Sequence, residues 1–228
     1  MARMLLLDLD GTLVDTVPDL AGALNRLMVS RGLAPFSLPE TALMIGDGVT
    51  VLVGRAFAAR DLTPDDQAMA DFSRDYGAHV ADASRPFPGI PGFMRDVAAD
   101  GWRLAVCTNK TAAAAHALLE TLGLMHLVCA IGGGDSFPVR KPDPAHLLAT
   151  LRLAGLSDGG DPAAAAVMVG DHANDVAAAH GAGVKVVFVT WGYGPVAMGA
   201  GADAVVDDIP ALRDAIARLV PPMAPPPG

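Results

Sequence analysis

Short apolar runs recur along this chain, each ending in a polar residue or glycine, and patterns rich in alanine and leucine separate several of them. The apolar runs occupy residues 4–9, 103–108, 127–131, 165–169, 185–190 and, in a shorter form, 204–206. Continuous apolar runs of this length are typical of strands buried on both faces, as in a parallel sheet. The patterns at 111–122, 144–154, 174–179 and 211–219 predict crossover helices. The sequence therefore predicts an α/β fold built on a doubly wound parallel sheet.

One long stretch near the N-terminus interrupts this alternation. Between residues 17 and 84 the sequence contains helical patterns and no convincing strand. Connections without secondary structure rarely reach this length. We expect a core formed by 1–16 and 85–220, an inserted helical cap at 17–84, and a disordered proline-rich tail at 221–228. Since ligands of such sheets bind beyond the carboxyl ends of the strands, an insertion at this point can close over a site.

Charge and hydropathy limit the partners of the chain. The formal net charge is −9 at pH 7, which argues against nucleic acid as a partner. A small anionic substrate remains compatible with this charge, because a metal ion and one or two cations set the local potential. No apolar run reaches the ~20 residues that a membrane helix needs, and Cys107 and Cys129 are expected to be reduced core residues. We expect a cytoplasmic protein with no membrane partner, either a monomer or a homodimer.

Two pairs of aspartates follow predicted strands. Asp8 and Asp10 come after the first apolar run, and alternation in an extended segment places them on the same side. Their mutual repulsion calls for a cation or a shared proton, although solvated acids in an Asp-Gly turn are about as common. Asp171 and Asp175 are four residues apart, so a helix beginning there places both on one face. Magnesium prefers such oxygen ligands; the alternative is simple capping of the helix.

Two further polar clusters follow the second and third predicted strands. Thr108 and Asn109 can bind a phosphate oxygen together with the start of the next helix, or act only as helix caps. Lys141 is flanked by prolines at 142 and 144, which restrict the approach to it, and its compact charge suits phosphate. An exposed loop lysine is the alternative. Because parallel strands bring their carboxyl ends to one edge, all four clusters are expected to meet there.

These motifs resemble those of haloacid dehalogenase superfamily phosphatases. The segment 8–12 matches the first motif of that family, Thr108 the second, Lys141 the third, and Gly170 and Asp171 with Asp175 the fourth. The resemblance spans nearly the whole chain and implies a doubly wound core with a helical type-1 cap in the inserted stretch. Segments 15–20, 45–48 and 132–136 are similar to those of phosphoglycolate phosphatases within the superfamily.

The resemblance also implies a mechanism and a cofactor. Asp8 is expected to be the nucleophile that forms an aspartyl-phosphate, and Asp10 the general acid and base. Mg²⁺ is expected to be held by a side-chain oxygen of Asp8, the backbone carbonyl of Asp10 and the carboxylate of Asp171. Asp175 is expected to support the ion directly or through another ligand.

The remaining expected site residues bind the substrate, a small phosphorylated metabolite. Gly11, Thr108, Asn109 and Lys141 are assigned to the phosphate group. Arg55, from the cap, is the candidate partner for the carboxylate of 2-phosphoglycolate, with an exposed helix arginine as the alternative. Hydrolysis of 2-phosphoglycolate to glycolate and phosphate is the expected reaction. Rival functions are a phosphatase for another sugar phosphate or nucleotide, a phosphomutase, and a non-catalytic phosphate-binding protein.

Overall fold

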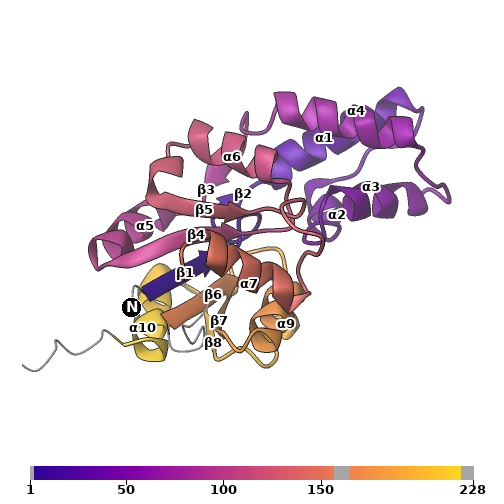
Figure 1. Cartoon of the computed structure of the whole chain (residues 1–228). Coiled ribbons are helices and arrows are strands. Elements are labelled where there is room, and N and C mark those ends of the chain that lie inside the picture. The colour runs from indigo at the N-terminus through magenta and orange to yellow at the C-terminus, as the bar shows by residue number, and fades with distance from the viewer. Residues whose placement is uncertain (1–2, 157–164, 222–228) are drawn as a thin grey trace, which may run out of the picture.

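The computed structural model describes residues 3–156 and 165–221. Its centre is a six-stranded sheet in the order β5-β4-β1-β6-β7-β8, in which every described neighbouring pair is parallel (Figure 1). The strands are β1 (Arg3–Leu7), β4 (Trp102–Cys107), β5 (Val128–Gly132), β6 (Ala166–Gly170), β7 (Lys185–Val189) and β8 (Ala204–Val206). All six predicted strands are present within a residue or two of their expected bounds, so the predicted fold class is confirmed.

Helices cover both faces of this sheet, as the alternation of side chains along β1 shows. Leu5 and Leu7 belong to one apolar cluster, whereas Met4 and Leu6 belong to another on the opposite face. The helices α5 (Ile90–Ala99), α6 (Ala112–Thr121) and α10 (Ile209–Leu219) pack on the first face, and α7 (Pro144–Leu153) and α9 (Ala173–Gly181) pack on the second. Burial on both faces explains why the strands are continuous apolar runs.

The inserted stretch contains helices only, in the part of the chain between two very short strands. It comprises α1 (Val17–Ser30), α2 (Leu38–Ala42), α3 (Val49–Ala58) and α4 (Asp66–Ala78), between β2 (Val14–Asp15) and β3 (Arg85–Pro86). The two short strands pair antiparallel and bring the ends of the insertion together. Figure 1 shows these four helices beyond the carboxyl end of β1. We call these helices and the loops between them the helical segment. Its division from the core at residues 17 and 84 stays a prediction.

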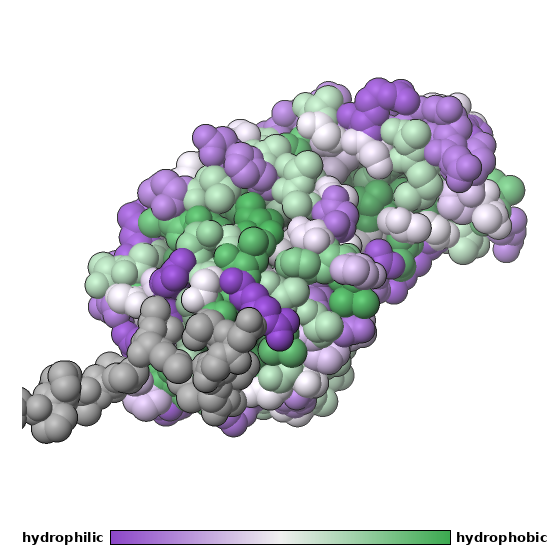
Figure 2. All heavy atoms as spheres, in the orientation of Figure 1, coloured by the Kyte–Doolittle hydropathy of each residue, from purple (hydrophilic) through white to green (hydrophobic). Residues whose placement is uncertain are grey.

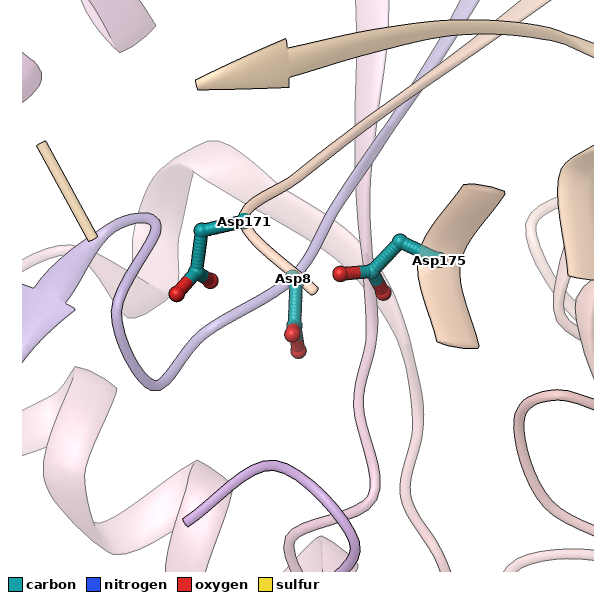
Figure 3. A group of neighbouring side chains, drawn as sticks. All are labelled: Asp8, Asp171 and Asp175. Atoms are coloured by element: carbon teal, nitrogen blue, oxygen red, sulfur yellow. The ribbon is translucent and has the colours of Figure 1, made fainter. Parts of the chain in front are cut away.

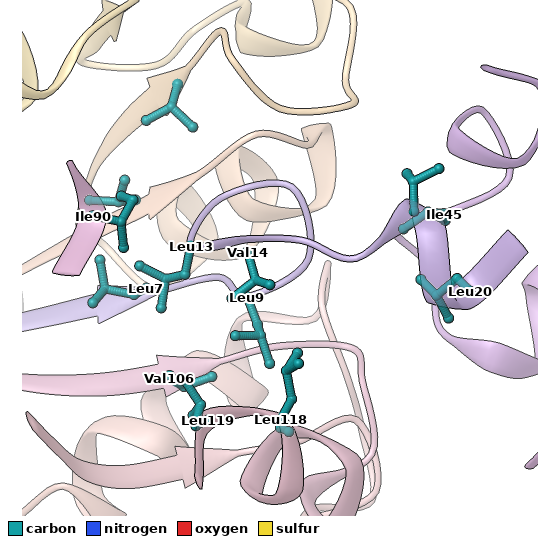
Figure 4. Packing of buried hydrophobic residues seen from close by; sticks show 14 of the residues in the cluster. Leu7, Leu9, Leu13, Val14, Leu20, Ile45, Ile90, Val106, Leu118 and Leu119 are labelled. Carbon is teal, nitrogen blue, oxygen red and sulfur yellow. The ribbon is translucent and has the colours of Figure 1, made fainter. Parts of the chain in front are cut away.

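The helical segment and the sheet share one apolar cluster. Leu7 and Val106 of the strands belong to it, as do Leu20 of α1 and Ile45, which follows α2 (Figure 4). At the base of the segment the carboxylate of Asp19 accepts hydrogen bonds from the amide and the hydroxyl of Ser84, at 2.7 and 2.6 Å. The outgoing and returning chains are therefore tied to each other.

Several expectations differ from the structure. Helix α5 was not among the predicted helices, and Cys129 is exposed rather than buried because β5 is an edge strand. The predicted disordered tail lies outside the described residues except for Pro221.

Apolar and polar residues are interspersed over the face in Figure 2, with polar residues gathered around α4. Among the described helices, none has the length and apolar character needed to cross a membrane.

Candidate active site

The sheet order brings the predicted clusters to one place. Strands β4, β1 and β6 are neighbours, and Thr108, Asp8 and Asp171 are the first residues after them. The amide of Asp8 still donates to the carbonyl of Val169 in β6, at 2.9 Å, and that of Thr108 to the carbonyl of Gly132 in β5, at 2.9 Å. Each side chain therefore projects from the end of a buried strand with its backbone fixed.

Three buried carboxyl groups converge at this edge. Asp8, Asp171 and Asp175 are 6%, 2% and 0% exposed, and each offers an oxygen within 4.8 Å of the others. Figure 3 shows Asp171 and Asp175 on either side of Asp8. Three acids so close repel one another, and a set of carboxylate oxygens suits a hard divalent cation. The donor set therefore fits a magnesium ion.

The carboxylate of Asp171 is fixed by groups from distant parts of the chain. Oδ1 accepts from the hydroxyl of Thr12 at 2.8 Å, and Oδ2 accepts from the amides of Tyr193 at 2.8 Å and Gly194 at 3.4 Å. Burial, followed by the charge of Asp8, raises the pKa of Asp171 to about 6. A nearby cation would favour the charged form and oppose this rise.

Gly11 allows this approach. Its φ is +85°, and an added Cβ would lie 2.3 Å from Oδ2 of Asp171. Its amide donates to the carbonyl of Val14 at 3.0 Å, so the amide is used by the turn. The expected role of Gly11 in binding phosphate stays a prediction; in the structure its amide donates within the turn.

Lys141 lies between two of the acids. Its Nζ is 2.9 Å from Oδ1 of Asp8 and 2.6 Å from Oδ1 of Asp175, and its side chain is 0% exposed. Burial alone would lower the pKa of Lys141, but the charges of Asp175 and Asp8 outweigh it and raise the pKa. Burial raises the pKa of Asp175, while Lys141 acts in the opposite direction. The other oxygen of Asp175 accepts from the amide of His172 at 3.0 Å, so both its oxygens have protein donors.

Asp10 has a partner that sequence reasoning missed. Nζ of Lys110 lies 2.8 Å from Oδ1 of Asp10 and 4.6 Å from the centre of the Tyr76 ring. Burial lowers the pKa of Lys110, and the charge of Asp10 more than compensates, so the pKa is raised overall. Lys110 follows Thr108 and Asn109 directly. Its position after a strand was the available signal, yet nothing in the sequence pairs it with a residue 100 positions away.

Thr108 and Asn109 differ in what they contact. Thr108 is buried at the edge of the sheet, and its hydroxyl oxygen accepts from the amide of Lys110 at 3.2 Å. The side-chain amide of Asn109 donates to the carbonyls of Gly46 and Lys141, at 3.0 Å each. Asn174 donates to the same Gly46 carbonyl at 2.8 Å. Asn109 therefore connects the helical segment to the core through Gly46, and its contact with phosphate stays a prediction.

Arg55 is paired within the helical segment and is absent from the lining of the cavity described below. One of its terminal nitrogens is 2.5 Å from Oδ2 of Asp47, and the other donates to the carbonyl of Met44 at 2.9 Å. Its side chain is 42% exposed. All three residues belong to the helical segment, so the guanidinium group stabilises the loop before α3.

A cavity lies between the core and the helical segment. The core contributes Asp8, Asp10, Thr108, Asn109 and Lys110 to its lining. The helical segment contributes Leu20, Ile45, Gly46, Gly48, Val49 and Leu52. One wall is therefore polar and charged, and the other consists of aliphatic side chains and backbone.

The loop after β7 is a second feature that the sequence reasoning missed. The hydroxyl of Tyr193 accepts from the amides of Thr16 and Val17 at 2.6 and 3.2 Å and donates to Oδ1 of Asp15 at 2.9 Å. The indole of Trp191 donates to the carbonyl of Thr12 at 3.1 Å. This loop therefore connects Asp171 with the start of the helical segment.

Comparisons with known proteins agree with this geometry. Residues 5–189 match the family model described as haloacid dehalogenase-like hydrolase. A phosphoglycolate phosphatase of Agrobacterium fabrum is 41% identical over 221 residues, covering 95% of this chain and 93% of the relative. One from Rhodospirillum rubrum is 42% identical over 224 residues, covering 94% and 90%. The structure of a predicted phosphoglycolate phosphatase from Haemophilus somnus superposes with a TM-score of 0.84 at 31% identity, covering 94% and 98%.

Because the family model matches residues 5–189 and relatives at about 41% identity cover most of its length, the chain belongs to the haloacid dehalogenase-like hydrolases. Within that family it is an enzyme of the phosphatase type, as the similarity to relatives at about 41% identity indicates. A protein with a related fold, CbbY from Rhodobacter sphaeroides, has been solved in complex with phosphate; it is 26% identical, with a TM-score of 0.76, and the match covers 93% of this chain and 96% of that one.

Proposed function

We propose that this phosphatase hydrolyses 2-phosphoglycolate to glycolate and phosphate, with Mg²⁺ as cofactor and an aspartyl-phosphate on Asp8 as intermediate. The aliphatic wall of the cavity carries the substrate assignment. Opposite Asp8 and Asp10, the side chains of the helical segment are Leu20, Ile45, Val49 and Leu52. Their side chains offer no polar group to the hydroxyls of a sugar or nucleotide, which favours a short leaving group whose carboxylate faces the polar wall. The names of the similar proteins support the same assignment.

Asp8 is the proposed nucleophile. Its Oδ1 accepts from the amide of Leu9 at 2.7 Å and pairs with Lys141 at 2.9 Å, which leaves Oδ2 for in-line attack on phosphorus. The new bond joins Oδ2 to phosphorus, and the bond from phosphorus to the ester oxygen breaks. Asp10, protonated on the oxygen that does not accept from Lys110, gives this proton to the departing oxygen. The resulting carboxylate then takes a proton from the water that hydrolyses the aspartyl-phosphate.

Positive charge has to balance the acids and the phosphate during both steps. Mg²⁺ would be held by Asp8, Asp171 and the backbone carbonyl of Asp10, where it supplies positive charge to the transferring phosphoryl group. Lys141 orients Asp8, and Asp175 holds Lys141 in place. Thr108 lies at the cavity wall, where its hydroxyl can donate to a phosphoryl oxygen.

The test is phosphate release from a panel of small phosphate esters, with and without a chelator. We expect selective, Mg²⁺-dependent turnover of 2-phosphoglycolate and its loss in Asp8→Asn, which keeps the shape of the side chain but removes the nucleophilic carboxylate. Preference for a sugar phosphate or nucleotide would overturn the substrate assignment and keep the chemistry. Undiminished turnover by Asp8→Asn would overturn the aspartyl-phosphate. Transfer between two positions of a substrate without phosphate release would indicate a phosphomutase.

A further inference from the structure

Lys110 is a buried cation that faces the cavity and has no part in the chemical steps above. Its side chain is 2% exposed, and it reaches the cavity from the segment after β4. Its Nζ is 2.8 Å from Oδ1 of Asp10, the residue proposed above to protonate the departing ester oxygen. The ring of Tyr76, from α4, lies 4.6 Å from the same nitrogen. The ammonium group therefore lies between the core and the helical segment, beside the proposed general acid.

The ammonium group has donors to spare. A lysine side chain carries three N–H donors and no acceptor. Oδ1 of Asp10 accepts a hydrogen bond from one of them. The ring of Tyr76 attracts the positive charge through its face, which does not require a directed N–H hydrogen bond. A further anion in the cavity would therefore find both a charge and an N–H group at Lys110.

Two other cations near the site, Lys141 and Arg55, are paired with acids, and Arg140, whose guanidinium comes close to Gly48, is absent from the cavity lining. Lys141 is held between Asp8 and Asp175, with its side chain fully buried. Arg55 is paired with Asp47 within the helical segment and is absent from the cavity lining. Of the described residues that line this cavity, Lys110 is the one with a positive charge.

We propose that Lys110 binds the carboxylate of a short phosphorylated hydroxy acid and so determines the specificity of the enzyme. This inference rests on the function proposed above and replaces Arg55 as the carboxylate partner. In 2-phosphoglycolate one methylene carbon separates the ester oxygen from the carboxylate. A substrate with its ester oxygen at Asp10 therefore places its carboxylate next to the neighbour of Asp10, which is Lys110. A phosphate ester whose leaving group has no carboxylate leaves the charge of Lys110 and its spare N–H groups without a partner, so the site discriminates against it.

The experiment compares two substrates of the same size and different charge. We would measure kcat/KM for 2-phosphoglycolate and for its neutral amide, 2-phosphoglycolamide, with the wild-type enzyme and Lys110→Met. The wild type should prefer the acid by about 100-fold, as expected for a buried charge pair, and the variant should lose most of that preference. Lys185→Met is the matched control. Lys185 also pairs with an aspartate at 2.9 Å, but it lies at the start of β7, away from the carboxyl edge, and should keep the preference.

Each other outcome has a defined meaning. An equal loss with both substrates in Lys110→Met would show that Lys110 acts only through Asp10 and would overturn the inference. Retained preference in that variant, or no preference in the wild type, would overturn it too. The proposed function fails separately if the wild type cleaves p-nitrophenyl phosphate but not 2-phosphoglycolate. Circular dichroism checks the fold, and Lys110→Gln, which keeps a donor without the charge, is read in the same way if the methionine variant unfolds.

Discussion

Two buried lysines contact the acids of this site. Lys141 lies between Asp8 and Asp175, and Lys110 lies beside Asp10, with both lysine side chains almost fully buried. A buried charge that loses its partner costs far more than an exposed one. The individual lysines are therefore important both for stability and for the chemistry of the carboxylates that they contact.

Lys141→Ala should lower both stability and activity. It leaves the carboxylates of Asp8 and Asp175 uncompensated in the interior, which we expect to cost about 3–5 kcal/mol of unfolding free energy. We expect kcat to fall about 100- to 1000-fold, as when a group that stabilises transition-state charge is removed. Urea unfolding and phosphate release measure the two effects. In Lys185→Ala, which removes an exposed ion pair, both should change little. Near-normal turnover by Lys141→Ala would contradict its role.

The residues of the site differ in how far the sequence could predict them. Asp8, Thr108 and Asp171 each follow a buried strand, so their meeting follows from the parallel sheet alone. The sequence could not show which of the two cations, Lys110 or Arg55, faces the cavity. Whether an arginine faces a cavity depends on its neighbours after folding, and here Asp47 pairs with Arg55 inside the helical segment. Asn109 shows the same limit, because its acceptor, the carbonyl of Gly46, arrives only when that segment docks.

At the scale of the elements, the loop after β7 connects Asp171, one of the acids proposed to hold the metal, to the start of the helical segment. The amide of Tyr193 donates to Asp171, and its hydroxyl accepts from the amides of Thr16 and Val17 at the start of α1. The first amides of a helix have no partner within the helix. Tyr193 satisfies them from the core, so it fixes where the helical segment begins.

Tyr193→Phe should therefore loosen the attachment of α1. Two amides and the carboxylate of Asp15 lose a partner, and we expect a loss of about 1–3 kcal/mol in unfolding free energy. Tyr76→Phe is the matched control, since the Tyr76 hydroxyl is buried without a hydrogen-bond partner among the described residues. Urea unfolding of both variants measures the difference. Equal losses would show that the Tyr193 hydroxyl contributes no more than packing.

The elements also show which sequence patterns were informative. The six sheet strands were predicted because burial on both faces makes them uniformly apolar. Strands β2 and β3 have two residues each, too few for any periodicity to appear. Helix α5 was missed because Pro91 and Gly92 lie in its first turn, where the pair resembles a loop, although proline is tolerated there.

For the molecule as a whole, the buried acids link folding to pH and to metal. The pKa of Asp171 is raised to about 6, from about 3.9 in an unfolded chain. The folded state therefore binds this proton more tightly. The resulting stabilisation is complete below about pH 4 and is lost as the pH rises through about 6. Above that pH the metal-free protein carries a buried charge that a divalent cation can compensate.

We expect Mg²⁺ to raise Tm more at about pH 7.5 than at about pH 5, because protons compete with the ion at the lower pH. Scanning calorimetry with and without Mg²⁺ at both values measures this difference. Asp171→Asn should lose most of the response at either pH. The same rise at both pH values in the wild type would contradict the linkage.

The dispersal of the site along the chain has a consequence for biosynthesis. Asp8 leaves the ribosome early, Lys110 and Lys141 follow, and Asp171 and Tyr193 emerge near the end of translation. The middle of the sheet also forms late, because β1 lies between β4 and β6, and both of these strands are synthesised after it. A nascent chain therefore carries the proposed nucleophile, Asp8, long before the groups that orient it. A chain that ends before Asp171 lacks part of the proposed metal site, so we expect such a product of premature termination to have no phosphatase activity.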